Sequence, residues 1–281
     1  MYLSRNDVRR AFAEDEFFPL FQPQVELGTG KLVGFEALAR WNHAYLGAIP
    51  PAAFIPIVLK NGCINLLTQK LLEKIFASAP LLPGSLRLSV NLSPLQLLDL
   101  TIPDRIADAA EQGGFPLGRL TIETTESALR DDLPGAQAVT RELKTLGCRL
   151  SLDDFGTEQS SLFHLLDLPF DELKVDRSFI RALTENLAGR KIVSAVISLC
   201  KDLGMITVAE GVETAEQAYI MNDLGCELAQ GWLFGRPAPA GDIPRILSAA
   251  PGTCAASSAT FVEMDKLSPT AVRAEEPCQV N

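Results

Sequence analysis

The sequence predicts an α/β fold, specifically a TIM-like (β/α)8 barrel that contains one antiparallel strand. Short apolar runs, typical of strands buried on both faces, alternate with helical patterns along most of the 281 residues. The alternation continues for about eight units without a second change of composition, which favours one closed barrel over an open doubly wound sheet. No Gly-x-Gly-x-x-Gly turn is present to indicate a dinucleotide-binding half.

The first elements depart from the parallel pattern. A short helix is predicted over residues 6–14, and two extended segments follow over residues 19–26 and 31–39. Between these segments lies the short turn Gly28-Thr29-Gly30. Strands joined by so short a turn must be antiparallel, so we expect one barrel strand to run against the others.

The rest of the chain follows the strand–helix repeat. The predicted strands are Leu86–Leu92, Leu120–Thr124, Arg149–Leu152, Glu172–Val175, Ile206–Ala209 and Glu227–Trp232. The predicted helices are Cys63–Ser78, Ile102–Gln112, Gly135–Thr145, Arg190–Leu203 and Ala215–Leu224. Gly204 and Gly225 follow two of these helices directly, where a left-handed residue commonly ends a helix.

The composition changes near residue 248. We therefore expect one domain over residues 1–248 and a disordered C-terminal tail over residues 249–281, which is small, polar and proline-containing. The alternative is that this tail packs as a last strand or helix.

The overall composition excludes several classes of function. A formal net charge of -10 disfavours binding to polymeric nucleic acid, so a phosphate ligand would need metal ions or a few well-placed cations. Six cysteines without a Cys-x-x-Cys pair, and only two histidines, disfavour a zinc site. The sequence contains no run of about 18 apolar residues, so no membrane-spanning segment is predicted. The first ten residues are charged and do not resemble a signal peptide. We expect a cytoplasmic protein with reduced cysteines.

Polar side chains stand at or near the C-terminal ends of the predicted strands. They are Glu36, Asn91, Glu123, Asp153, Asp154, Lys174, Glu210 and Gln230. A single polar residue after a strand would have no functional meaning, because loops are exposed to solvent and are commonly polar. So many, several of them directly after aliphatic runs, indicate side chains that converge on the active-site face of a barrel.

Converging carboxylates repel one another, so they indicate a bound divalent cation. Glu36, Asn91, Glu123 and Asp153 offer only oxygen atoms, which suit Mg²⁺, Mn²⁺ or Ca²⁺. Asp154 would serve a second ion, because two metals about 3.5–4 Å apart activate water and clamp a phosphate. A protonated Lys174 would orient that water or stabilise charge in the transition state; the alternative is a structural ion pair with Asp153 or Glu210.

The run FEALARW at residues 35–41 resembles the characteristic motif of the EAL-domain family, cyclic di-GMP-specific phosphodiesterases. Further matching segments lie in order between about residues 6 and 248. They are FQPQV at 21–25, SVNLSP at 89–94, IETTES at 122–127, LDDFGT at 152–157, ELKVDRSFI at 172–180, VAEGVET at 208–214 and AQGWLFGRP at 229–237.

The resemblance implies metal-dependent hydrolysis of cyclic di-GMP to linear pGpG in a barrel with one antiparallel strand, using two Mg²⁺ or Mn²⁺ ions. The implied metal ligands are Glu36, Asn91, Glu123, Asp153, Asp154 and Glu210, and the implied catalytic residues are Lys174, Glu210 and Glu36. The implied substrate-binding residues are Gln22, Leu38, Arg40, Gln230 and Pro237, with Glu126 anchoring the loop after Asp154. A homodimer is the family expectation, with a sensor or cyclase protein as a further partner.

Two positions depart from the family pattern. Glu158 stands where the loop after Asp154 usually has glycine; if that glycine has a positive φ, a side chain adds strain of about 1 kcal/mol or more. Leu59 replaces a carboxylate that is not a metal ligand, so we expect altered packing there. The Glu158 substitution supports an alternative function, a non-catalytic receptor for cyclic di-GMP or a protein-interaction module.

Overall fold

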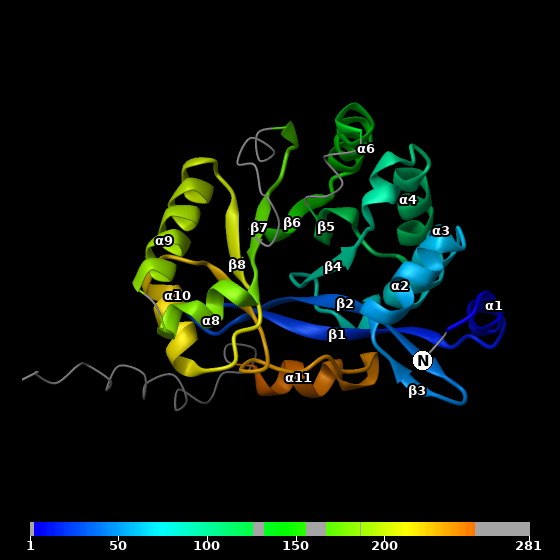
Figure 1. The fold of residues 1–281 in the computed structure, drawn as a ribbon, viewed down its shortest axis with the longest axis horizontal. Coiled ribbons are helices and arrows are strands. Elements are labelled where there is room, and N and C mark those ends of the chain that lie inside the picture. The colour runs from blue at the N-terminus through cyan, green and yellow to red at the C-terminus, as the bar shows by residue number, and fades with distance from the viewer. Residues whose placement is uncertain (1–2, 126–131, 156–166, 186, 251–281) are drawn as a thin grey trace, which may run out of the picture.

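The computed structural model describes residues 3–125, 132–155, 167–185 and 187–250 (Figure 1). Eight strands close into a barrel in the order β1-β9-β8-β7-β6-β5-β4-β2, and β2 pairs back with β1. They are β1 (Phe17–Glu26), β2 (Leu32–His43), β4 (Arg87–Asn91), β5 (Leu120–Thr125), β6 (Arg149–Phe155), β7 (Glu172–Val175), β8 (Ile206–Ala209) and β9 (Leu228–Gln230).

Strand β1 is antiparallel to both of its neighbours, β2 and β9, whereas the other barrel pairs are parallel. The predicted barrel with one antiparallel strand is therefore confirmed. The reason is local, because the turn after Glu26 is too short for a crossover helix.

The long β1–β2 ribbon carries a second, smaller core. Strand β3 (Gly47–Ile49) pairs with the end of β2, and the helices α1 (Arg5–Ala13), α2 (Pro51–Lys60) and α3 (Ile64–Phe76) pack nearby. Its buried side chains are Val8, Ala11, Phe17, Trp41, Ile49, Phe54, Val58 and Leu67. Phe17, Trp41 and Phe54 form a cluster in which Phe17 lies 5.1 and 5.6 Å from the Trp41 and Phe54 ring centroids, and these two rings lie 5.9 Å apart.

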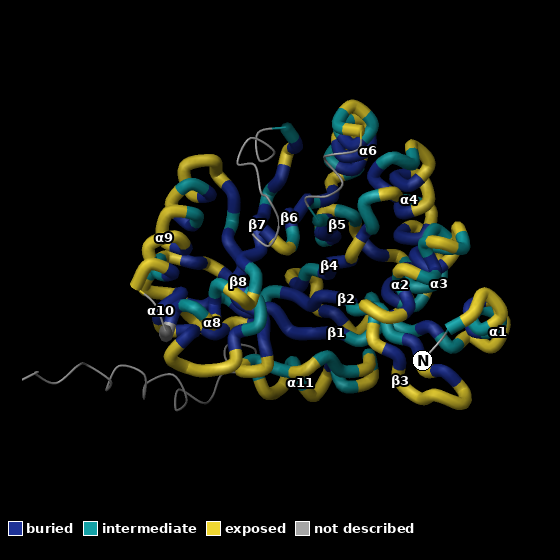
Figure 2. Tube along the Cα trace, viewed as in Figure 1, coloured by how far each residue is buried: buried dark blue, intermediate teal, exposed yellow. Residues whose placement is uncertain are grey.

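The remaining helices surround the barrel and bury their inner faces against the strands (Figure 2). They are α4 (Ile102–Gly113), α6 (Leu133–Thr145), α8 (Arg177–Glu185), α9 (Leu187–Asp202), α10 (Ala215–Asp223) and α11 (Ile243–Ala249). Short 3-10 turns lie between helices and strands: η1 (Ala79–Leu81), η2 (Pro94–Leu98), η3 (Leu117–Arg119) and η4 (Ala240–Asp242). The glycines predicted to end two helices are confirmed, because Gly204 and Gly225 have φ of 73° and 89°.

The two faces of the barrel strands differ in polarity. Aliphatic residues such as Leu150 and Leu152 belong to the main core. The alternate positions of β6, which face the barrel interior, carry Arg149, Ser151 and Asp153. The interior is thus unusually polar for a barrel whose lumen is normally filled by branched aliphatic residues. The part of this polar interior near the C-terminal ends of the parallel strands is the candidate site.

Several expectations remain predictions. The boundary at residue 248 is untested; α11 extends to Ala249, and residues 251–281 lie outside the described part, as do Glu126 and Glu158. In the described ranges, no helix is both long and apolar enough to cross a bilayer. Three of the four described cysteines are buried, and all four are free thiols.

Candidate active site

Lys174 lies at the centre of four carboxylates that come from different strands. Its Nζ is 2.6 Å from Glu210 Oε1 and 2.7 Å from Glu123 Oε2. Glu36 Oε2 and Asp153 Oδ2 follow at 3.4 and 3.5 Å. The lysine side chain is 1% exposed, so these contacts replace its hydration. The predicted convergence of strand ends is therefore present, and the ion-pair alternative for Lys174 describes its contacts in this structure.

Amide side chains complete the surroundings of Glu36. Asn91 Nδ2 donates to Glu36 Oε1 at 2.7 Å, and Gln230 Nε2 donates to Glu36 Oε2 at 2.6 Å. The same Gln230 nitrogen donates to Gln22 Oε1 at 3.0 Å. Gln22 and Gln230 come from β1 and β9, which are paired in the barrel. The antiparallel strand thereby places Gln22 beside residues more than 200 positions away in the chain.

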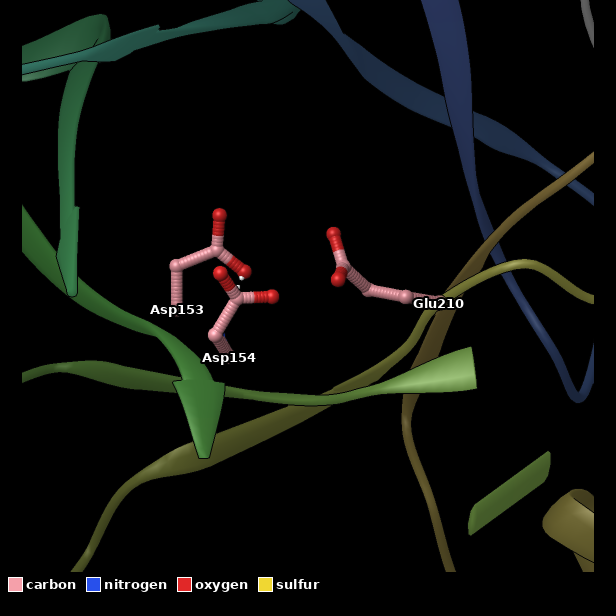
Figure 3. Close-up of side chains that lie close together, drawn as sticks. All are labelled: Asp153, Asp154 and Glu210. Carbon is pink, nitrogen blue, oxygen red and sulfur yellow. Dashed lines mark hydrogen bonds between the residues drawn. The ribbon is translucent and has the colours of Figure 1, made fainter. Parts of the chain in front are cut away.

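Asp153, Asp154 and Glu210 form a second cluster beside Lys174. One oxygen atom from each lies within 4.8 Å of the others, and Figure 3 shows the three carboxylates directed toward a shared space. Consecutive strand residues normally point to opposite faces. Here the register with β7 shifts between Leu152 and Phe155, and Asp154 has a φ of 56°. This bulge brings both aspartates to the same side.

Burial and mutual repulsion set the charges of these groups. Burial and then the Glu36 carboxylate raise the pKa of Glu123 well above its usual range. Burial, opposed by Lys174 but reinforced by Asp153, raises the pKa of Glu210 to about 8. Burial alone would raise the pKa of Glu36, but the charge of Lys174 and the hydrogen bonds from Gln230 and Asn91 outweigh burial, so the pKa of Glu36 is lowered. For Lys174 the carboxylates outweigh burial, so its pKa is raised well above its usual value.

The donor set fits divalent metal. Five carboxylates (Glu36, Glu123, Asp153, Asp154 and Glu210) surround one lysine, so the cluster carries excess negative charge. Moreover, Glu123 Oε1 is buried without a protein hydrogen-bond partner. An uncompensated buried carboxylate oxygen is costly unless water or a cation satisfies it. Oxygen-only donors are those that Mg²⁺ and Mn²⁺ prefer.

A cavity of about 250 Å³ opens beside the cluster. It is lined by Gln22, Glu36, Leu38, Asp176, Arg177, Glu210, Gly211, Glu213, Gln230, Gly231 and Trp232. Gly231 permits two backbone segments of the chain to approach closely here, because a Cβ atom would clash with the carbonyl oxygen of Val212.

The predicted substrate-binding residues lie in different places in the structure. Gln22, Leu38 and Gln230 line this cavity, whereas Arg40 is half-buried and donates to its neighbour's carbonyl, Ala39 O, at 2.8 Å. Pro237 lines a different cavity, on the outside of the barrel. Their roles stay predictions.

Sequence reasoning missed two conspicuous residues of the cavity. Arg177 supplies a cation next to many carboxylates, and its position three residues after Lys174 was the available signal. Trp232 is 56% exposed, and the Arg236 guanidinium lies 4.2 Å above its ring. An exposed indole at a cavity rim is suited to stacking on a planar ligand.

Residues 5–237 match the family model described as EAL domain. The chain belongs to the EAL domain family. It is 36% identical over 239 residues to the bifunctional diguanylate cyclase/cyclic di-GMP phosphodiesterase MucR of Pseudomonas aeruginosa, covering 84% of this chain and 35% of MucR. It is 34% identical over 236 residues to the cyclic di-GMP phosphodiesterase RocR of the same organism, covering 83% of this chain and 60% of RocR. This EAL domain thus spans less than two thirds of these curated relatives.

Solved structures agree with the barrel. The MucR phosphodiesterase in complex with c-di-GMP superimposes with a TM-score of 0.80 at 35% identity, covering 85% of this chain and 98% of that chain. The EAL enzyme Bd1971, in its form with bound cAMP and cyclic di-GMP, gives a TM-score of 0.82 at 27% identity, covering 86% and 67%. This EAL domain is therefore related to cyclic di-GMP phosphodiesterases in both sequence and fold.

Proposed function

We propose that this EAL domain hydrolyses cyclic di-GMP to linear pGpG with Mg²⁺ or Mn²⁺. The observation that supports this best is the set of carboxylates from Glu36, Glu123, Asp153 and Glu210 around Lys174, with Asn91 bonded to Glu36. Glu36 lies within β2, and the others lie at or near the C-terminal ends of their strands. This is the active-site face in barrel enzymes. The relatives MucR and RocR, named as cyclic di-GMP phosphodiesterases, supply the substrate class.

Two sets of side chains would each hold one metal ion. Glu36, Asn91, Glu123 and Asp153 would hold one, and the cluster that contains Asp154 and Glu210 would hold the other. When bound, such ions supply Lewis-acid stabilisation of the phosphate charge and a lower pKa for the attacking water.

The protein's own groups would orient the water. Lys174 stays charged, and its ammonium donates to Glu210 at 2.6 Å, so it fixes the orientation of that carboxylate. In the metal-free protein the pKa of Glu210 is raised to about 8, and a bound cation would lower it again, so Glu210 would act as a deprotonated ligand that holds the ion and its water. Gln230 holds Glu36 at 2.6 Å, which keeps that ligand from rotating.

The substrate would bind in the cavity beside the carboxylate cluster. Arg177 would contact a phosphate, because a guanidinium matches its geometry with two parallel hydrogen bonds. The half-buried Arg40, two alternation steps beyond Glu36, would serve a phosphate in the same way. Trp232 would stack on a guanine base.

Incubation of the purified protein with cyclic di-GMP and Mg²⁺ or Mn²⁺, with pGpG followed by chromatography, tests the proposal. We expect turnover with either ion, loss of turnover in Glu36→Ala and Lys174→Ala, and inhibition by Ca²⁺, whose looser coordination spoils a two-metal geometry. Binding of cyclic di-GMP without turnover would instead support the receptor function that Glu158 suggested. A homodimer, a sensor or cyclase partner and a cytoplasmic location stay predictions.

A further inference from the structure

A groove of about 610 Å³ is lined by residues of α11, of β1 and of the segment that follows β9. Figure 1 shows α11 beside β1, on the outside of the barrel. Val25, Leu32, Phe234 and Ile246 give it an apolar floor. Among the described residues that line it, the charged ones are Arg236 and Arg245, both cationic in a chain of net charge -10. The groove shares no lining residue with the candidate active site. It therefore suits an occupant that is apolar and acidic.

The sequence itself contains such a segment shortly after the last residues that line the groove. Ala249 and Ala250 line the groove, and the sequence continues from there to residue 281. Within residues 251–281, the run Phe261-Val262-Glu263-Met264-Asp265 combines three large apolar residues with two carboxylates. The ten residues 251–260 between it and the groove are mostly small.

We propose that this groove is a binding site for an apolar, acidic peptide and that its occupant is residues 261–265 of the same chain. Phe261 and Met264 would fill the apolar floor, and the two carboxylates would pair with Arg236 and Arg245. Ten residues of such composition span roughly 17–19 Å on average, which is enough to turn back into the groove. A tether this short raises the effective concentration to the order of millimolar, so contacts with a dissociation constant well below about 1 mM would keep the groove mostly occupied.

Docking would be coupled to the substrate cavity through one side chain. Arg236 lines the groove and also covers the Trp232 ring at 4.2 Å, and Trp232 lines the cavity beside the carboxylate cluster. A carboxylate bound to Arg236 would therefore hold this cation–aromatic pair in place. The docking itself does not depend on the proposed hydrolysis.

Hydrogen exchange of the full chain, followed by mass spectrometry without metal or nucleotide, tests this site. We expect the amides of residues 261–265 to exchange at least about tenfold more slowly than those of residues 268–276. Phe261→Asp should abolish the difference, and Val272→Asp, a matched change farther along the same segment, should leave it intact.

A charge swap separates docking from general damage to the fold. Arg236→Glu with Arg245→Glu should remove the protection, and adding Glu263→Arg with Asp265→Arg should restore it. Arg105→Glu on α4, away from the groove lining, serves as the control. Exchange of residues 261–265 at the rate of an unstructured peptide in the native chain would overturn the proposal. Protection that survives the arginine reversal would overturn it equally.

Discussion

Replacement of Lys174 by methionine tests how the carboxylate cluster is held together. The substitution removes the ammonium but keeps most of the aliphatic stem. In the native protein Nζ lies 2.6–3.5 Å from four carboxylates, and the side chain is 1% exposed. Removing one partner of a buried ion pair costs about 3–5 kcal/mol, because it leaves uncompensated buried charge. We expect the metal-free variant to lose stability of this order at pH 8.5.

The loss should depend on pH in a defined direction. Burial raises the folded-state pKa of Glu123 and of Glu210, and Lys174 opposes the rise in both, so loss of the ammonium should raise these two pKa values further above their unfolded values. Such groups favour folding below the unfolded pKa, and this contribution is lost as pH rises through the folded pKa. The difference in unfolding free energy between Lys174→Met and the native protein should therefore be smaller at pH 5.5 than at pH 8.5.

Urea unfolding in EDTA at both pH values measures this difference. Lys144→Met is the matched control, because Lys144 pairs with Asp171 at 2.7 and 2.8 Å but is 33% exposed. A partly exposed pair contributes only about 0–1 kcal/mol. If Lys174→Met were no less stable than Lys144→Met at pH 8.5, the reasoning from burial would be wrong.

Three further predictions concern the proposed metal site. Glu36→Gln keeps the size of the side chain but removes the negative charge of the carboxylate that Asn91 and Gln230 hydrogen-bond. The affinity for Mn²⁺, measured by calorimetry, should therefore fall by at least about 10–100-fold. An unchanged affinity would show that Glu36 is not a metal ligand. Because the pKa of Glu210 is raised to about 8, metal binding should displace a proton and weaken as pH falls from 8 to 6, and an affinity that is flat over this range would contradict it. Asp154 has a φ of 56°, which asparagine tolerates, so Asp154→Asn should match the native thermal stability while Asp154→Ala loses about 1 kcal/mol; equal stability of the two variants would argue against strain at this position.

Much of the fold followed from local patterns in the sequence. The strand–helix repeat and the short turn near Gly28 predicted the barrel and its antiparallel strand, and the structure confirms both. Helices α2, α8 and α11 and strand β3 were not predicted. Helix α2 is an apolar run interrupted by Pro56, so it lacks a clear helical period. Strand β3 is only three residues long and forms by pairing with β2.

The candidate site was predicted as a set of residues but not as a geometry. The rule that strand ends meet on one face placed Glu36, Glu123 and Lys174 together, and their contacts agree. The same rule could not show that Asp154 joins Asp153, because strand alternation sends consecutive residues to opposite faces. The bulge with positive φ at Asp154 decides this.

The sequence by itself determined the class of barrel and the chemical type of the site. Hydrophobic periodicity is local, and the oxygen donors can be identified from residue type and position after each strand. Only the tertiary structure decided which oxygen meets which nitrogen, because barrel closure pairs β1 with β9 across some 200 residues and brings Gln22 to Gln230. It also decided that one buried lysine contacts four carboxylates, an outcome of packing that no local pattern encodes.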